Sequence, residues 1–331
     1  MSNDDRCTKP QVKLFFSIFE AHHDGRLFVA TEKWDERCAY ALMKKQMIVR
    51  LYNHVYADPA YWNDLGIEGR IFQLASAIAI VEPDAVFCGA TAALLYGIGS
   101  AYSLLDKVQV LLPRSTRRDT YEFVEYRRWR AGEVWQLGPF TLTDPYRTVV
   151  DIARTTAFRY ALGYVDGLAR EYGVEREELR AYAQANCRGL HGIARAFEVF
   201  EHMDGRSDNG GESEARAAMI LAGVAAPELQ VEITRPGNAG YYLADYGWQM
   251  PNGSWMLAEL HGLGKFEDDA QNDPEHTAAK TYRAALMRDA NLRAMGHNVI
   301  HFKLSDTYDV KAFGSMMRGC GIPTTKPYVG S

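Results

Sequence analysis

The feature that most constrains the fold of this chain is a pair of apolar segments flanking Pro251-Asn252-Gly253. Asn-Gly is a strong signal for a hairpin turn, because both residues tolerate a positive φ. Asp245 precedes Asn252 by seven residues (252 − 245), and Glu259 follows it by seven (259 − 252). A simple hairpin register therefore places the two carboxylates close together on paired strands.

The neighbours of these two acids along the chain, Leu243, Leu257 and Leu260, are apolar. Burial of a carboxylate without a partner is unfavourable. A divalent cation is one such partner, because Mg²⁺ prefers one or two carboxylates together with water and substrate phosphate oxygens. The pattern therefore predicts that Asp245 and Glu259 are ligands of Mg²⁺ or Mn²⁺. The alternative is a pair of solvated acids on an exposed hairpin.

Three more residues near the hairpin are candidates for catalysis. Glu212 opens a predicted helix over 212–222, where its charge also suits the helix N-terminus; helix capping is the alternative role. His261 has the chemistry to bind a metal or relay a proton, or is an ordinary surface or core histidine. Lys265 follows a Gly-Leu-Gly segment and would orient a water or stabilise charge on a phosphate, or is a surface lysine in a loop.

Four segments in order give the region of about 210–305 a family resemblance. The segments are Gly211-Glu212-Ser213-Glu214-Ala215-Arg216, Leu243-Ala244-Asp245-Tyr246, Ala258-Glu259-Leu260-His261-Gly262-Leu263-Gly264-Lys265-Phe266 and Arg288-Asp289-Ala290-Asn291-Leu292-Arg293-Ala294-Met295-Gly296-His297-Asn298-Val299-Ile300. Together they resemble the PD-(D/E)xK nuclease superfamily, and more narrowly its endonuclease-like domains related to very-short-patch repair enzymes. The resemblance implies metal-dependent phosphodiester hydrolysis at the acids named above. The chain departs from the pattern at His261, where the family has an acid and the wider superfamily a lysine.

The first 60 residues are expected to form a winged helix. Val12, Phe15, Phe16 and Phe19 are spaced like the apolar stripe of a helix. A short helix capped by Thr31, a helix over 35–46 and two strands over 47–57 complete the order helix, helix, helix, hairpin. Four residues would then contact phosphates from a recognition helix and a wing, the alternative being a solvated helix face. They are Lys44, Lys45, Arg50 and His54.

The segment 61–202 is expected to be an α/β domain with a helical end. Its predicted elements are helices over 67–80 and 90–96, strands over 86–87, 108–112, 124–129 and 141–143, and a helix through Ile152. Arg147 and Asp151 are four residues apart, which predicts an ion pair on one helix face.

The densest basic run of the chain lies in this segment. Its arginines are Arg114, Arg117, Arg118, Arg127, Arg128 and Arg130. They are interleaved with Tyr121, Tyr126 and Trp129, an arrangement that suits phosphate and base contacts. A charged, exposed hairpin is the alternative.

Three motifs in the first half resemble AbiEi-type antitoxins. They are Val55-Tyr56-Ala57, Gly89-Ala90-Thr91-Ala92-Ala93-Leu94-Leu95-Tyr96-Gly97 and Arg147-Thr148-Val149-Val150-Asp151-Ile152-Ala153-Arg154. This resemblance implies DNA and a cognate toxin as partners. The expected organisation is an α+β multidomain chain: a winged helix over 1–60, a middle domain over 61–202, a polar, glycine-containing linker over 203–209, and a nuclease-like domain with a mixed sheet over 210–331.

Composition bears on the function classes only weakly. The net charge of −5 gives no support for nucleic-acid binding, although basic residues can be concentrated locally. The five cysteines are scattered without a CxxC pair, which argues against a zinc site and a disulfide framework. No apolar run approaches the roughly 18 residues of a membrane span, and no signal-peptide core is visible, so the expected location is the cytoplasm.

Two functional hypotheses remain open from the sequence. The first is a DNA-binding protein with a Mg²⁺-dependent endodeoxyribonuclease domain. The second is a non-catalytic, antitoxin-like transcriptional regulator whose C-terminal domain keeps the nuclease fold without its chemistry. The substitution of His261 for an acid or lysine leaves both in place.

Overall fold

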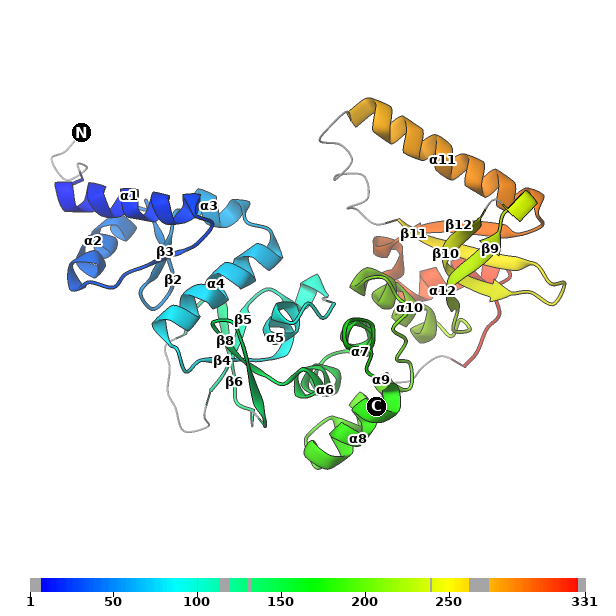
Figure 1. Cartoon of the computed structure of the whole chain (residues 1–331), viewed down its shortest axis with the longest axis horizontal. Helices are drawn as coiled ribbons and strands as arrows, with labels where there is room; N and C mark the ends of the chain where they lie inside the picture. Colours follow the sequence, from blue (N-terminus) through cyan, green and yellow to red (C-terminus); the bar gives the residue numbers. More distant parts are fainter. Residues whose placement is uncertain are drawn as a thin grey trace. The chain divides into compact units, whose positions relative to one another are not determined.

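The computed structural model describes residues 7–99, 101–112, 120–129, 132–238, 240–261 and 274–326. These residues form an α+β chain with three sheets, divided into two compact units (Figure 1). Unit 1 comprises Met1–Ile152 and Tyr182–Arg188, and unit 2 comprises Ala153–Ala181 and Gly189–Ser331. The predicted α+β multidomain class is confirmed at this level. In the part of the chain described, no helix is both long and apolar enough to cross a membrane.

Unit 1 begins with a small three-stranded sheet and two helices. The elements are α1 (Lys9–His23), β1 (Phe28–Val29), α2 (Lys33–Lys44), β2 (Val49–Tyr52) and β3 (Val55–Ala57), with strand order β1-β3-β2. Two helices, not the expected three, precede the hairpin. Phe28 and Val29 form a strand because they pair antiparallel with Tyr56 and Val55.

The buried face of α1 differs from the stripe predicted for it. Leu14 and Ile18 are buried in the core, whereas Phe16 and Phe19 are 60% and 64% exposed. Both sets have helical spacing, so periodicity alone does not say which face meets the core.

The second part of unit 1 is a five-stranded sheet with helices. Its elements are α3 (Pro59–Asp64), α4 (Ile67–Val81), β4 (Val86–Phe87), α5 (Gly89–Leu95), β5 (Val108–Leu111), β6 (Val124–Arg127), β7 (Val134–Leu137), β8 (Phe140–Thr143) and most of α6 (Pro145–Thr155), whose last residues are assigned to unit 2. The strand order is β6-β5-β4-β8-β7. Strand β7 has no counterpart in the sequence prediction. The predicted ion pair is confirmed: Arg147 Nε lies 2.7 Å from Asp151 Oδ2, with both side chains buried.

Unit 2 contains helices and a four-stranded mixed sheet. Its elements are α7 (Phe158–Tyr172), α9 (Ile193–Phe200), α10 (Gly210–Leu221), β9 (Glu228–Thr234), β10 (Tyr241–Gln249), β11 (Trp255–His261), α11 (Pro274–Ala294), β12 (Asn298–Lys303) and α12 (Val310–Gly319); α8 (Arg176–Asn186) runs from unit 2 into unit 1. The strand order is β12-β11-β10-β9. Only the β11–β12 pair is parallel, so the sheet is mixed, as predicted.

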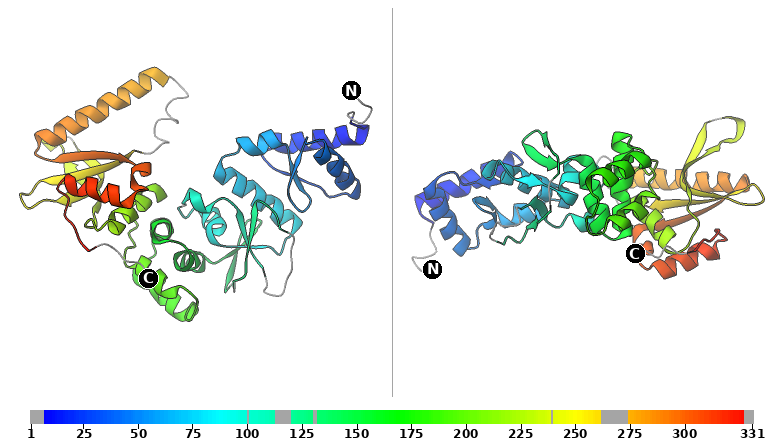
Figure 2. Two further views of the ribbon diagram at one scale, coloured as in Figure 1. Left: turned by 180° about the vertical axis from the view of Figure 1, so that it is seen from behind. Right: turned by 90° about the horizontal axis from the view of Figure 1, so that it is seen from below.

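Helices cover both faces of this sheet (Figures 1 and 2). On one face, Tyr246 and Ala258 share a core with Met219 of α10 and Phe313 of α12. On the other face, Leu257 shares a second core with Leu292 of α11. Each face of the sheet therefore has its own helical layer.

The segment 203–209 is part of unit 2 and does not divide two compact units. The Asp204 N–H donates to Asp166 Oδ1 of α7 at 2.8 Å, and Arg170 donates to the Ser207 carbonyl at 2.8 Å. An added Cβ at Gly205 would lie 3.0 Å from Ala169 Cβ. The glycine and polar residues that suggested a linker instead allow a close approach to α7.

Candidate functional site

The hairpin register places Asp245 and Glu259 at the end of a paired ladder. Tyr246 pairs with Ala258, and the same register runs to Gln249 and Trp255 at the turn. Asp245 and Glu259 are the next residues of the two strands beyond the Tyr246–Ala258 pair. The predicted hairpin is therefore confirmed.

Asp245 lies at an irregular point of β10, because its two neighbours along the strand pack into different cores. Ala244 packs in the core under α11, whereas Tyr246 packs in the core with α10. Gln230, between the corresponding residues of β9, has φ = +52°. The Asp245 Oδ2 accepts a hydrogen bond from the Leu260 N–H at 2.8 Å. This carboxylate therefore bonds the β11 backbone just past the last paired residues.

Glu259 is a partly buried carboxylate held by an arginine. Its side chain is 14% exposed, and its Oε1 accepts a hydrogen bond from Arg288 of α11. Burial raises the pKa of Glu259; the bond from Arg288 opposes this change, and the negative charge of Asp245 adds to it. Two carboxylates that repel one another at a partly dry position form an arrangement that a cation stabilises.

Two histidines and an aspartate lie beside Glu259. In the parallel β11–β12 register, Glu259 pairs with His301. The ring of His261 stacks on that of His301, with centroids 4.8 Å apart and planes 16° from parallel. His301 Nε2 lies 2.7 Å from Asp289 Oδ2. Partial desolvation, then the positive charges of His301 and Lys303, lower the pKa of His261.

Arg288, Asp289 and His301 were not among the site residues predicted from sequence. His301 is two residues after the apolar Val299 on a strand that was predicted, so the two share one face of the strand, and this spacing offered one signal for the side on which His301 lies. Arg288 and Asp289 begin one of the segments that carry the family resemblance, but the apolar residues of the predicted helix do not define its inward face clearly, so spacing alone did not place their side chains at the site.

The Glu212 carboxylate bonds its own helix start. It accepts hydrogen bonds from the Asp208 N–H at 2.8 Å, Asn209 Nδ2 at 2.9 Å and Gln230 Nε2 at 3.3 Å. In return, Asn209 Oδ1 accepts from the Glu212 N–H at 3.0 Å. These contacts match the capping role. After burial itself, the negative charges of Glu212 and then Asp245 raise the pKa of the buried Tyr246 phenol.

The sequence predicts two metal ligands, Asp245 and Glu259, whereas most cations require several donors. Lys265 lies outside the described residues. Within the described ranges, no group of three His, Cys, Asp or Glu side chains is arranged to hold a metal ion. Asp245 and Glu259 nevertheless fit a hard cation such as Mg²⁺, whose remaining ligands are commonly water and phosphate oxygens.

The predicted wing residues of unit 1 are tied to their own hairpin. Arg50 Nε donates to the Tyr52 carbonyl at 3.2 Å, and its Nη2 donates to Asn53 Oδ1 at 2.9 Å. His54 has φ = +59°, and its Nδ1 contacts Glu36 of α2. The Lys44 ammonium lies 4.7 Å from the ring centroid of Tyr40. Lys45, the neighbouring candidate, is half-buried.

The hairpin also adjoins the strand that carries the basic run. The hydroxyls of Tyr52 and Tyr126 are 3.0 Å apart, which links β2 to β6. Arg127 forms an ion pair with Glu125 at 2.7 Å, and its guanidinium lies 5.2 Å from the ring centroid of Trp129.

Of the other arginines of the basic run, the structure describes only Arg128. Arg128 is exposed. The remaining members of the run, Arg114, Arg117, Arg118 and Arg130, lie outside the described residues.

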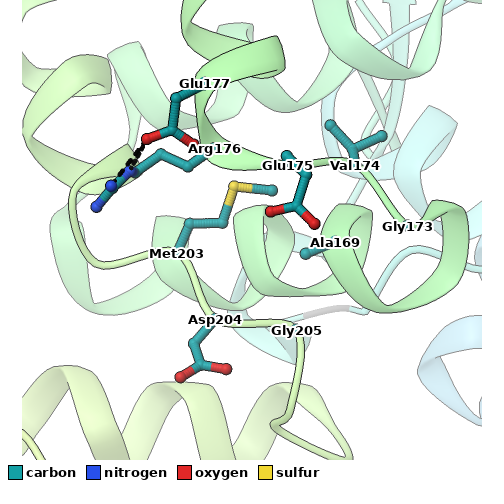
Figure 3. A pocket seen from close by; sticks show the side chains of 9 residues that line it. All are labelled: Ala169, Gly173, Val174, Glu175, Arg176, Glu177, Met203, Asp204 and Gly205. Carbon is teal, nitrogen blue, oxygen red and sulfur yellow. Dashed lines mark hydrogen bonds and ion pairs between the residues drawn. The ribbon is translucent and has the colours of Figure 1, made fainter.

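A separate hollow of about 420 Å³ opens in unit 2 near the turn between α7 and α8 (Figure 3). It is lined by Ala169, Gly173, Val174, Glu175, Arg176, Glu177, Met203, Asp204 and Gly205. Glu177 pairs with Arg176 at 2.8 Å, and Asp204 pairs with Arg206 at 2.7 Å. The hollow contains none of the predicted site residues.

Comparison with known proteins gives relatives without an established activity. No family model matches the chain. The uncharacterized protein Rv2248 of Mycobacterium tuberculosis H37Rv is 32% identical over 206 residues, which cover 62% of this chain and 72% of that protein. The uncharacterized protein MT2308 of strain CDC 1551 matches equally.

A solved structure gives a more distant similarity. The crystal structure of the RV2827C protein from M. tuberculosis matches with a TM-score of 0.38 and 14% identity, over 63% of this chain and 82% of that one. Similarity at this level supports no argument about function. The identity and coverage of the first two proteins do establish kinship: the chain belongs to the same family as the uncharacterized mycobacterial proteins Rv2248 and MT2308.

Proposed function

We propose that this protein binds DNA through unit 1 and that unit 2 is a metal-dependent phosphodiesterase of the PD-(D/E)xK kind. The observation that carries the proposal is the placement of Asp245 and Glu259 at the end of one hairpin ladder, with burial and mutual repulsion raising the pKa of Glu259. The resemblance of the surrounding segments to endonuclease-like domains agrees with this site.

The named residues would have three roles: binding a metal ion, accepting a proton and contacting DNA. Asp245 and Glu259 would hold Mg²⁺ or Mn²⁺, which when bound polarises a phosphate and lowers the pKa of a coordinated water. The lowered pKa of His261 favours its neutral ring, which is the form that would serve as a proton acceptor at this site. Lys44, Arg50 and Arg128 would contact the DNA backbone, since each presents positive charge at an exposed position.

Cleavage of supercoiled plasmid DNA in Mg²⁺ or Mn²⁺ tests the proposal. Wild type should nick the plasmid, and Glu259→Gln should lower the rate on the order of 100-fold, as loss of an electrostatic contact to the reacting groups does. Glu232→Gln is the matched control, because Glu232 is an exposed acid of the same sheet. Wild type that binds the plasmid but cuts it in neither metal would rule out the enzyme. Equal cutting by Glu259→Gln and wild type would refute the site.

One contact favours a second candidate function, a non-catalytic, antitoxin-like transcriptional regulator that binds DNA and a cognate toxin. Arg288 already neutralises Glu259, so the fold has a partner for this carboxylate without any cation. Under this alternative, wild type protects a defined duplex site in EDTA as well as in Mg²⁺, and it never cuts.

A further inference from the structure

Arg288 is in direct contact with the carboxylate of Glu259. Its guanidinium donates to Glu259 and also to the Leu243 carbonyl of β10. Its side chain remains 25% exposed, whereas that of Glu259 is 14% exposed. The arginine therefore reaches from α11 into the site while keeping one side toward solvent.

Two positive groups would compete for Glu259 when a divalent cation binds. Counting only Asp245, Glu259 and Arg288, the formal charge of the site is −1 (−1 − 1 + 1), and a divalent cation brings it to +1 (−1 + 2). Without the arginine, the loaded site would have no net charge (−2 + 2). Arg288 thus makes the loaded site attractive to an anion.

The hydrogen bond from Arg288 to the Leu243 carbonyl would position the guanidinium when Glu259 binds a cation. The Leu243 carbonyl does not compete for the metal site, so it can keep the guanidinium at the rim after the bond to Glu259 is lost. Guanidinium groups bind phosphate through paired N–H donors. A phosphate oxygen drawn to the cation would then meet these donors.

We infer that Arg288 is a substrate-binding residue of this site, held by Glu259 in the cation-free protein and transferred to a DNA phosphate when a cation occupies that carboxylate. The inference rests on the proposed function. It assigns to Arg288 the positive charge that the sequence Glu259-Leu260-His261 lacks where related nucleases have a lysine.

Salt-dependent DNA binding tests the phosphate contact. Fluorescence anisotropy is measured in Mg²⁺ with a short duplex carrying phosphorothioate linkages, which slow cleavage. Arg288→Met should reduce the slope of log affinity against log salt by about 0.9, the value of one phosphate contact. Arg293→Met is the matched control: it removes the same charge from the same helix at a side chain 60% exposed, and should leave the slope unchanged.

Cation binding without DNA gives a second, independent measurement. Electron paramagnetic resonance of Mn²⁺ should show about two- to fivefold tighter binding to Arg288→Met than to wild type, because the competing ion pair is gone. Arg293→Met should match wild type. If Arg288→Met melts below the assay temperature, Arg288→Gln serves for both measurements with the same expectations.

The outcomes separate this inference from the function on which it rests. Wild type that binds no duplex at any salt concentration overturns the proposed function and the phosphate role with it. Wild type that binds, with Arg288→Met and Arg293→Met giving equal slopes, overturns only the role of Arg288. Mn²⁺ affinity that fails to rise in Arg288→Met overturns the exchange of Glu259 between arginine and cation.

Discussion

At the scale of single residues, Glu259 shows how neighbouring charges and burial set the chemistry of one carboxylate. Burial, the ion pair with Arg288 and the charge of Asp245 act in different directions, and the net effect is a raised pKa. A raised pKa means that the folded protein binds a proton at this group more tightly than the unfolded chain does. Cation binding requires the ionised form, so acid and metal compete for one site.

The raised pKa of Glu259 predicts two effects of pH. Mn²⁺ affinity should fall as pH is lowered through a range above that of an ordinary glutamate. The contribution of Glu259 to stability should be fully present below its unfolded pKa and lost as pH rises through its folded pKa. Urea unfolding should therefore show Glu259→Gln gaining stability relative to wild type at neutral pH. A relative gain that instead grew on acidification would contradict the sign of the shift.

At the scale of secondary structure, the β10–β11 hairpin carries the candidate site and also packs closely against neighbouring side chains at Gly247. Gly247 lies two residues from Asp245, and an added Cβ would come within 2.8 Å of Val231 Cγ2 and 3.0 Å of Trp255 Cε3. These neighbours belong to the core under α11. The hairpin can pack against that core only because this position has no side chain.

Gly247→Ala is therefore expected to destabilise unit 2 by about 1–3 kcal/mol, the usual effect of overpacking a core. The matched control is Gly319→Ala at the end of α12, where an added Cβ meets nothing within 4 Å. That change should be neutral or stabilising by up to about 1 kcal/mol, as alanine favours the helix. Urea unfolding of both variants checks this, and equal stabilities would show that the sheet relaxes around the new methyl group.

Elements with strong local patterns could be predicted from sequence, whereas those defined by distant partners could not. The hairpin follows from Asn252-Gly253 and the ion pair in α6 from its four-residue spacing. Strand β1 has only two residues and exists because it pairs with β3. Strand β7 contains apolar residues, but all four of its residues are exposed, so it shows no alternation of buried and exposed positions. In α12, a glycine at position 314 disfavours a helix when the sequence is considered locally. The structure explains this glycine by packing, because an added Cβ there would lie 2.8 Å from Ala222 Cβ.

The candidate site likewise contains residues whose positions follow from a local pattern and residues placed by distant parts of the chain. Asp245 and Glu259 lie on one hairpin, so their proximity could be inferred from a single turn. Arg288 and His301 reach Glu259 from a later helix and strand, and the packing that brings them there depends on the whole sheet.

At the scale of the whole molecule, the division into units determines which fragments can fold. Helix α7 belongs to the unit that contains the candidate site. Asp166 of α7 pairs with Arg216 of α10 at 2.7 Å, and Arg159 pairs with Glu214 at 2.7 Å. All four side chains are largely buried, so removal of one partner leaves an unpaired charge in the interior.

A fragment spanning 210–331, which begins after the segment once expected to be a linker, should therefore be poorly stable. It loses Arg159 and Asp166 together, and breaking a buried pair typically costs about 3–5 kcal/mol. A fragment spanning 153–331 keeps both pairs and serves as the comparison. Thermal unfolding followed by circular dichroism distinguishes them; equal melting temperatures would show that α7 is dispensable to the sheet.

The reach of Arg159 also has a consequence for the order of events during protein synthesis. Its guanidinium donates to the carbonyl and the hydroxyl of Thr307, 148 residues further along the chain. The ribosome therefore releases α7 well before the last partners of its buried arginine exist. Until Thr307 emerges, the buried guanidinium of Arg159 lacks these two acceptors, so the final packing of α7 must follow the synthesis of β12 and the residues just after it.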